Sequence, residues 1–167
     1  KLLKEIIYGV GIQEIKGLTN VAVEHITFDS RKVIKLTAFV ATRGTQSDGH
    51  NYIQQAIENG ACCIVCEKFP DHFNPNVTYV KVSDSSNALG LIASNFFDNP
   101  SEKLKLVGIT GTNGKTTSAT LLYDLFRLLG YKTGLISTVS IKILHHTFEA
   151  THTTPDAIAI NRTLNKM

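Results

Sequence analysis

Short apolar runs separated by polar turns make up the first part of the chain. Their lengths and composition are typical of strands, because each has four to eight residues bounded by turn signals. The strand candidates are residues 24–28, 38–41, 61–66 and 77–82.

Two segments between and after these runs have helical periodicity. In residues 51–59, Ile53, Ala56 and Ile57 recur at helical spacing, and Gly60 follows as a C-cap. Ser83 or Asp84 can cap a second helix. That helix carries Leu89, Ile92, Ala93, Phe96 and Phe97 on one face. Alternating strands and helices predict a small α/β domain over residues 1–100.

A turn-rich stretch at residues 97–101 separates this domain from a second one, residues 101–167. There, an apolar strand at 104–110 precedes a glycine loop, a helix through Leu129 and a strand at 132–139. The helix has an apolar face formed by Leu121, Leu122, Leu125, Phe126 and Leu129. This β-loop-α-β order predicts the start of a P-loop-type parallel-sheet ATPase domain, which we expect to be incomplete.

The segment Thr154-Pro155-Asp156 predicts one more helix start. Thr154 would be the cap, with proline in the first helical position and an acid in the first turn.

Composition and charge exclude several classes of protein. Hydrophobic residues make up 43% and charged residues 19% of the 167 residues, a globular balance. The net charge of +3 comes from scattered basic residues, so no nucleic-acid patch is expected. No apolar run has the ~20 residues that span a bilayer, and no signal peptide is recognisable. The basic bias favours anionic small molecules as ligands.

The three cysteines, Cys62, Cys63 and Cys66, lie within one apolar run. A single C-x-x-C without a second pair is weak evidence for a metal or redox site. Because free cysteine behaves as a small hydrophobe, we interpret the run as a buried strand. Closely spaced free thiols fit a reducing cytosol.

The segment after the 104–110 strand carries the most specific chemistry. It comprises Gly111, Thr112, Asn113, Gly114, Lys115, Thr116 and Thr117. Glycines allow backbone N–H groups to turn toward an anion, and the following helix start adds its positive dipole end. Lys115 can reach the β- and γ-phosphates, and the Thr116 hydroxyl is placed to bind Mg²⁺. The sequence therefore predicts a site for ATP with Mg²⁺.

Two observations qualify this assignment. Ile109 stands where the general P-loop pattern has its first glycine. A tight turn capped by threonine would explain Gly111 and Gly114, but not the Lys-Thr-Thr run after them.

The loop resembles the ATP loop of the Mur ligase family. Further stretches resemble the family's N-terminal domain: Asp29-Ser30-Arg31, Phe39-Val40-Ala41 with Gly44, Asp48-Gly49-His50, Ala56, Gly60-Ala61 and Glu67. Thr153-Thr154-Pro155 resembles a segment of the central domain. The family usually has a glycine-containing turn between Arg31 and Phe39, which this sequence lacks.

The resemblance implies an ATP-dependent amide ligase of bacterial peptidoglycan synthesis. Phe28, Ser30, Thr45, Gln46 and Ser47 would line the uridine-nucleotide pocket. His152, Thr153 and Thr154 would face the sugar-peptide part of UDP-N-acetylmuramoyl-L-Ala-D-Glu. The substrate carboxylate would attack ATP to give an acyl phosphate, from which an amino acid displaces phosphate.

The same resemblance implies a monomeric cytoplasmic enzyme that binds neither nucleic acid nor membrane, with Lys115 as its catalytic residue. The fragment alone is expected to be inactive.

Several alternatives stay open. The third amino acid could be diaminopimelate or lysine. A sister ligase that adds D-Ala-D-Ala shares the Asp-Ser-Arg and Asp-Gly-His strings, and a non-catalytic nucleotide-binding module is a different class.

Single residues also have alternatives. Without the resemblance, the residues around Phe28 and Ser30 are typical of an ordinary turn. Arg31 could pair with a phosphate or with Asp29. A metal cluster of His145, His146 and Glu149 is disfavoured because adjacent strand residues point to opposite faces.

Overall fold

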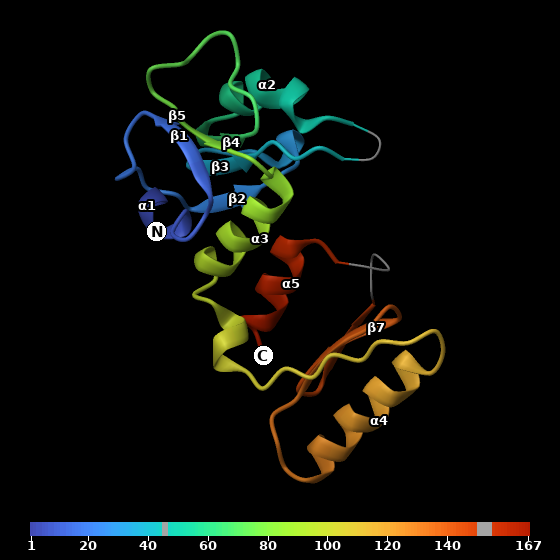
Figure 1. The fold of residues 1–167 in the computed structure, drawn as a ribbon. Helices are drawn as coiled ribbons and strands as arrows, with labels where there is room; N and C mark the ends of the chain where they lie inside the picture. The colour runs from blue at the N-terminus through green and yellow to red at the C-terminus, as the bar shows by residue number, and fades with distance from the viewer. Residues whose placement is uncertain (45–46, 150–154) are drawn as a thin grey trace. The chain divides into compact units, whose positions relative to one another are not determined.

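The computed structural model describes residues 1–44, 47–149 and 155–167. The chain forms two compact units, Lys1–Asn99 and Pro100–Met167 (Figure 1). Each unit has its own sheet, and each is described by itself. None of the described helices is both long and apolar enough to cross a bilayer.

A five-stranded sheet forms the centre of the first unit. Its strands are β1 (Ile12–Lys16), β2 (His25–Thr27), β3 (Thr37–Val40), β4 (Ala61–Cys66) and β5 (Thr78–Val82). They lie in the order β1-β5-β4-β3-β2. The strands β2 to β5 are parallel, and only β1 at the edge is antiparallel. The carboxyl ends of the four parallel strands therefore lie at one edge of the sheet, where open α/β sheets bind ligands.

Helices cover both faces of this sheet. α2 (Ile53–Glu58) lies on one face, and α1 (Leu3–Ile6) and α3 (Ser85–Phe96) lie on the other (Figure 1). Short 3₁₀ turns, η1 (Ser30–Lys32) and η2 (Gly49–Tyr52), follow β2 and precede α2. The α2 side of the core includes Phe39, Ile53, Ile64, Cys66 and Tyr79.

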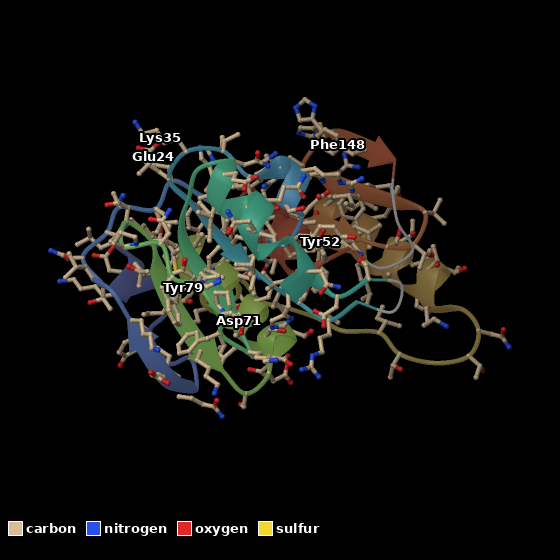
Figure 2. All side chains as sticks on the ribbon, turned by 90° about the horizontal axis from the view of Figure 1, so that it is seen from above. Glu24, Lys35, Tyr52, Asp71, Tyr79 and Phe148 are labelled. Atoms are coloured by element: carbon tan, nitrogen blue, oxygen red, sulfur yellow. The ribbon has the colours of Figure 1, made fainter. Side chains whose placement is uncertain are left out.

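Tyr79 is 1% exposed and its hydroxyl accepts a hydrogen bond from the Asn74 amide at 2.9 Å. Glu24 and Lys35, in contrast, are exposed at the rim (Figure 2).

The four parallel strands and both longer helices of this unit were predicted from the sequence. Of the two proposed caps for α3, Asp84 is correct, since its carboxylate accepts a hydrogen bond from the Asn87 amide at 2.9 Å. The pattern did not predict α1 or β1. α1 is a single turn, and β1 is a largely exposed edge strand that offers little apolar alternation.

The connection from η1 to β3 turns without glycine. Leu36 adopts the left-handed conformation, with φ of 63°. Its carbonyl accepts hydrogen bonds from the amides of Glu24 at 2.9 Å and His25 at 3.3 Å, so the turn fastens the start of β2. A leucine here is strained, because a left-handed L-residue costs about 1–2 kcal/mol.

The second unit contains a long helix and an antiparallel sheet. Its elements are η3 (Pro100–Lys103), α4 (Lys115–Leu128), β6 (Gly134–Ile136), β7 (Ser140–Ile143), β8 (His146–Glu149) and α5 (Ala157–Leu164). The strands pair in the order β6-β7-β8. The Tyr123 hydroxyl of α4 donates to the Leu144 carbonyl at 2.7 Å, which ties the helix to the β7–β8 turn.

Three element predictions for this unit are wrong. Residues 104–110 form no strand, because no described strand pairs with them, and Leu106 and Val107 are exposed. The strand expected at 132–139 is confined to β6, which pairs antiparallel with β7. α5 begins at Ala157, two residues later than predicted, and is capped by Asp156, whose carboxylate accepts from the Ala159 amide at 2.8 Å. Thr154, the predicted cap, lies outside the described residues.

The helix predicted through Leu129 is confirmed as α4, with Gly130 in the left-handed conformation just after its end. Its expected apolar face, however, is largely open in the described part of the unit. Leu121 and Leu129 are 64% and 62% exposed. Few hydrophobic side chains of this unit are buried among the described residues: Tyr123, Leu135, Ile143 and Ile158.

Candidate functional site

The glycine loop before α4 has the backbone that its sequence requires. Gly111 and Gly114 have φ of 146° and 74°, values that side-chain-bearing residues rarely adopt. A Cβ at Gly114 would meet no atom within 4 Å, and one at Gly111 only the Asn113 carbonyl at 3.7 Å. Backbone conformation rather than crowding therefore selects glycine at both positions.

The start of α4 is open toward this loop. Gly114 is the N-cap, and no side chain among the described residues caps the helix. The first intrahelical bond runs from the Ser118 amide to the Gly114 carbonyl at 2.9 Å. The amides of Lys115, Thr116 and Thr117 precede that bond, so they present the positive end of the helix dipole to the loop.

Lys115 folds back over the loop. Its ammonium donates to the carbonyls of Gly111 and Thr112, the latter at 3.2 Å. Thr112 and Asn113 are exposed, and Thr116 is half-buried at the second helical position. The structure thus brings the seven predicted ATP-site residues together around one helix start, and their roles stay predictions.

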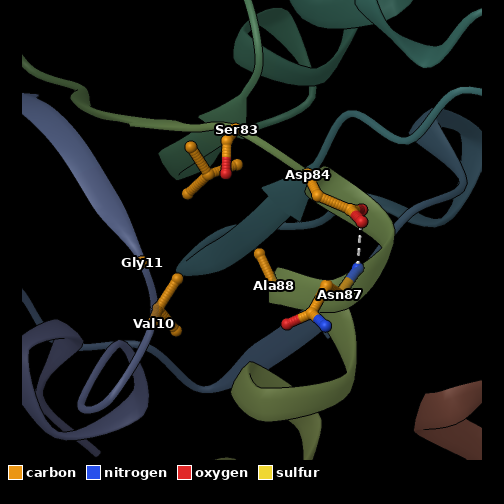
Figure 3. A pocket seen from close by; sticks show the side chains of 7 residues that line it. Val10, Gly11, Ser83, Asp84, Asn87 and Ala88 are labelled. Carbon is orange, nitrogen blue, oxygen red and sulfur yellow. Dashed lines mark hydrogen bonds between the residues drawn. The ribbon is translucent and has the colours of Figure 1, made fainter.

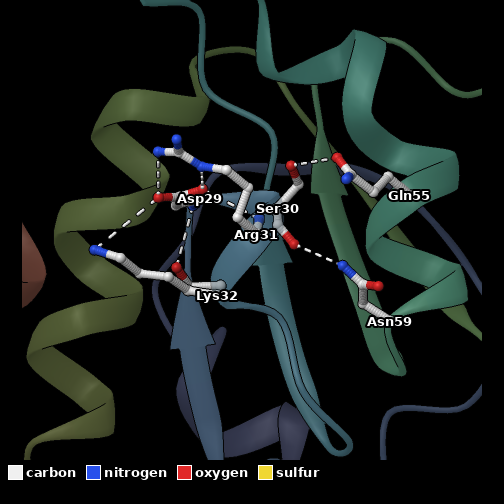
Figure 4. A network of polar contacts seen from close by, with 7 residues as sticks. Asp29, Ser30, Arg31, Lys32, Gln55 and Asn59 are labelled. Carbon is white, nitrogen blue, oxygen red and sulfur yellow. Dashed lines mark hydrogen bonds and ion pairs between the residues drawn. The ribbon is translucent and has the colours of Figure 1, made fainter.

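At the carboxyl edge of the first unit, Phe28 and Ser30 follow β2. Phe28 is 36% exposed and Ser30 only 7%. The Ser30 hydroxyl donates to Gln55 Oε1 at 2.8 Å, and the Asn59 side chain donates to the Ser30 carbonyl at 3.0 Å (Figure 4). Ser30 therefore joins η1 to α2, and its hydroxyl oxygen retains the capacity to accept a hydrogen bond.

Ser47 is exposed after β3, the strand next to β2. The other predicted substrate residues, Thr45, Gln46, His152, Thr153 and Thr154, lie outside the described residues.

Arg31 pairs with Asp29 rather than pointing away from it. Its Nε and Nη2 donate to the two Asp29 carboxylate oxygens, both at 2.9 Å (Figure 4). The hydrogen bond from Arg31 lowers the pKa of Asp29, and Lys32 at 4.0 Å adds to the effect. Of the two partners left open for Arg31, the structure shows Asp29.

Glu67, just after β4, joins the start of α3 to the loop after β3, a role that was not predicted from the sequence. Its Oε1 accepts from the Ser85 amide at 3.0 Å and the Ser85 hydroxyl at 2.8 Å. Its Oε2 lies 3.0 Å from Arg43 Nε. The Ser85 amide bond lowers the pKa of Glu67 most. The only signal in the sequence was the family resemblance of Glu67.

A small hollow of about 220 Å³ lies where β1 begins and β5 ends (Figure 3). Val10, Ser83, Asp84 and Asn87 are among its lining residues. The Asp84 carboxylate is already engaged as the α3 cap. Among the predicted substrate residues that the structure describes, Phe28, Ser30 and Ser47 do not line it.

The cysteine run forms β4, as predicted, and its thiols point different ways. Cys66 packs in the α2-side core, whereas Cys63, three positions earlier, faces the opposite side of the sheet. Cys62 is an extra residue at a register shift, with its thiol 3.5 Å from the Thr37 carbonyl. In the described ranges no three His, Cys, Asp or Glu side chains are grouped to hold a metal ion.

Comparison with known proteins identifies the two halves. Residues 22–97 match the model "Mur ligase family, catalytic domain", and residues 109–167 match "Mur ligase middle domain". A UDP-N-acetylmuramoyl-L-alanyl-D-glutamate–2,6-diaminopimelate ligase of Cytophaga hutchinsonii is 55% identical over 166 residues. That match covers 99% of this chain and 34% of the relative, so the chain spans about a third of its length.

Solved structures agree with the sequence matches. A UDP-N-acetylmuramoyl-L-alanyl-D-glutamate–2,6-diaminopimelate ligase matches with a TM-score of 0.73 and 23% identity, over 99% of this chain and 33% of that one. The MurF ligase of Thermotoga maritima, solved in complex with ADP, matches with a TM-score of 0.52 and 26% identity, over 72% and 26%. The predicted α/β fold is confirmed, and most strands of the first sheet are parallel. The chain belongs to the Mur ligase family.

Proposed function

We propose that this chain is the N-terminal part of a MurE-type ligase. Such an enzyme uses ATP to join a third amino acid to UDP-N-acetylmuramoyl-L-Ala-D-Glu through an acyl phosphate. The observation that carries the proposal is the 55% identity, over 99% of the chain, with a ligase named for diaminopimelate. We infer diaminopimelate as the added amino acid for the same reason. Free thiols in β4 fit action in the reducing bacterial cytoplasm.

In this proposal the second unit binds ATP. The exposed amides at the start of α4 bind the phosphates, and Lys115 exchanges its loop carbonyl partners for phosphate oxygens. The charge of Lys115 then offsets the negative charge that moves with the transferred phosphoryl group.

The residues also fit Mg²⁺, because the Thr116 hydroxyl is a hard oxygen donor at the helix start, and Mg²⁺ takes few protein ligands beside the nucleotide. A bound Mg²⁺ would supply further charge neutralisation at the phosphates.

The first unit binds the uridine-nucleotide end of the substrate in this proposal. Phe28 offers a partly exposed ring, Ser30 an acceptor oxygen, and Ser47 an exposed hydroxyl at the neighbouring strand end. The nucleophile belongs to the substrate, so the protein's contribution is binding and orientation.

The test is an ADP-release assay with the full-length protein, ATP, Mg²⁺ and UDP-N-acetylmuramoyl-L-Ala-D-Glu. Turnover should require diaminopimelate, and Lys115→Ala should reduce it by on the order of 10²-fold or more, through lost transition-state charge stabilisation. Lys132→Ala, at an exposed lysine of the same unit, is the control.

Near-normal turnover in Lys115→Ala would contradict the phosphate-loop assignment. Turnover with D-Ala-D-Ala and a tripeptide substrate would instead identify the sister ligase. Nucleotide binding without any ligation would indicate a non-catalytic module.

A further inference from the structure

Polar side chains fasten the loop after β3 to the end of β4 and the start of α3, at the edge where the uridine nucleotide is proposed to bind. We call this group the edge clasp. Its members are Arg43, Asp48, His50, Glu67 and Ser85.

The imidazole of His50 is the centre of the edge clasp, and its side chain is 13% exposed. Nε2 accepts a hydrogen bond from the Glu67 amide at 2.9 Å. The proton of the neutral ring must then be on Nδ1, which donates to Asp48 Oδ1 at 2.6 Å. The same Asp48 oxygen accepts from the His50 amide at 2.9 Å. The ring therefore connects the loop after β3 to Glu67, the residue that follows β4.

The backbone around His50 is equally constrained. The Gly49 amide donates to the Thr42 carbonyl at 2.9 Å. A Cβ at Gly49 would lie 2.8 Å from that oxygen and 2.9 Å from the Thr42 nitrogen, so only glycine fits. Arg43 and Asp48 form a β-bridge, and the Gly44 amide donates to the Ser47 carbonyl at 3.0 Å. The two ends of the loop are thus joined, and Ser47 is held beside them.

Both carboxylates of the edge clasp are stabilised in the ionised form. The His50 amide is the main cause of the lowered pKa of Asp48, and the Ser85 amide is the main cause for Glu67. The charged Glu67 also holds Arg43, 3.0 Å away, on the first stem of the loop.

We infer that His50 is a positioning residue for the uridine-nucleotide site, acting through Ser47 and the loop stems without touching substrate. The inference rests on the proposed function of the first unit. It follows from the hydrogen bonds on both ring nitrogens, which fix the stems of the loop after β3, and from the pairing of β3 with β2, whose carboxyl end carries Phe28 and Ser30. Loss of the ring releases the stems of the loop and Ser47, so the substrate must order them on binding.

The experiment compares steady-state kinetics of the full-length protein with those of His50→Ala, His50→Gln and the control His72→Ala. His72 is an exposed histidine of the same unit, outside the edge clasp. His50→Ala should raise KM for UDP-N-acetylmuramoyl-L-Ala-D-Glu by about tenfold, the equivalent of one hydrogen bond. It should leave kcat within about twofold and KM for ATP unchanged.

His50→Gln retains an acceptor with similar reach to the Glu67 amide, so its rise in KM should be smaller. A second pair gives an independent comparison if His50→Ala fails to fold. Asp48→Asn keeps the oxygen that accepts from His50, so its KM for the uridine substrate should equal that of the parent. Asp48→Ala removes that oxygen and should raise this KM as His50→Ala does.

The outcomes separate the inference from the function on which it rests. An active parent whose KM for the uridine substrate is unchanged in His50→Ala and Asp48→Ala overturns the inference alone. A fall in kcat with no change in KM indicates lost folded protein and overturns it as well. A parent that does not use the uridine substrate contradicts the proposed function, and the inference with it.

Discussion

Polar residues at the strand ends of the first unit can either stabilise the protein's own loops or bind a ligand, and the sequence does not distinguish these two roles. Ser30 was predicted to bind substrate, and the structure shows that its hydroxyl already donates to Gln55. Arg31, a candidate phosphate ligand, is paired with Asp29. Polar residues at a strand end first satisfy the loop's own backbone and neighbours, and a ligand uses what remains. The sequence identifies the residue types, but only the structure shows which donors and acceptors remain available to a ligand.

The three cysteines provide a prediction at this scale. Cys63 and Cys66 are fully buried, and burial raises the pKa of both thiols, that of Cys66 to about 11. Cys62 is partly exposed, and burial raises its pKa as well. Since the thiolate is the reactive form, a thiol reagent at pH 8 should label Cys62 first, and the other two only on unfolding.

Mass spectrometry of labelled peptides with and without denaturant gives the order of reaction. A Cys62→Ser variant is the control, because it should leave the native protein almost unlabelled. Rapid labelling of Cys63 in the folded protein would contradict the assignment of β4 as a buried strand.

At the scale of elements, prediction from sequence succeeded where burial left a clear apolar pattern. β3 and β4 are continuous apolar runs that are buried on both faces, and α3 has one apolar face. It failed where partners decide the outcome: residues 104–110 are apolar enough for a strand but pair with none among the described residues. β1 was missed for the opposite reason, since its hydrogen bonds to β5 hold an exposed and polar segment in the sheet.

The Leu36 turn gives a prediction about one connection between elements. Because Leu36 has φ of 63°, glycine should be better than alanine at this position, the reverse of the usual order. We expect Leu36→Gly to be more stable than Leu36→Ala by about 1 kcal/mol, since only alanine keeps the left-handed strain. Both variants lose the leucine side chain, so the free energy of that loss cancels when the two are compared.

Urea unfolding of both variants measures the difference in the free energy of unfolding. The same pair at Leu91, an exposed position inside α3, is the control and should favour alanine. Equal stabilities at position 36 would show that the turn relaxes.

For the whole molecule, the two units differ in how much core they possess. The first buries both faces of a five-stranded sheet under helices. The second leaves most of the apolar face of α4 exposed in its described part. Since burial of apolar surface is the main stabilising contribution, the units should differ sharply in independent stability.

We therefore predict that residues 1–99 fold cooperatively on their own, whereas residues 100–167 do not. Thermal unfolding followed by circular dichroism should show one sharp transition for the first segment and a broad or absent one for the second. The second segment should also bind a hydrophobic dye such as ANS. A sharp transition in residues 100–167 would contradict this prediction.

If it folds, the segment 1–99 also allows a direct test of uridine-nucleotide binding. UDP or UDP-N-acetylmuramoyl-dipeptide should shift NMR signals near Phe28, Ser30 and Ser47, and Ser30→Ala should weaken the response. A folded segment that shows no response at about millimolar ligand, the weak end of specific affinity, would count against the proposed role of the first unit.

The N-cap residues of the longer helices determine at which helix start an anion can bind. α3 and α5 begin at Asp84 and Asp156, whose carboxylates already occupy helix-start amides and repel a second negative group. α4 begins at Gly114, and no charge stands there except the lysine that follows. Among the described helices of eight or more residues, α4 alone therefore has a vacant positive terminus. The acidic caps thus have a selective effect as well as a stabilising one, since among these described helices they leave only the start of α4 open to the proposed triphosphate.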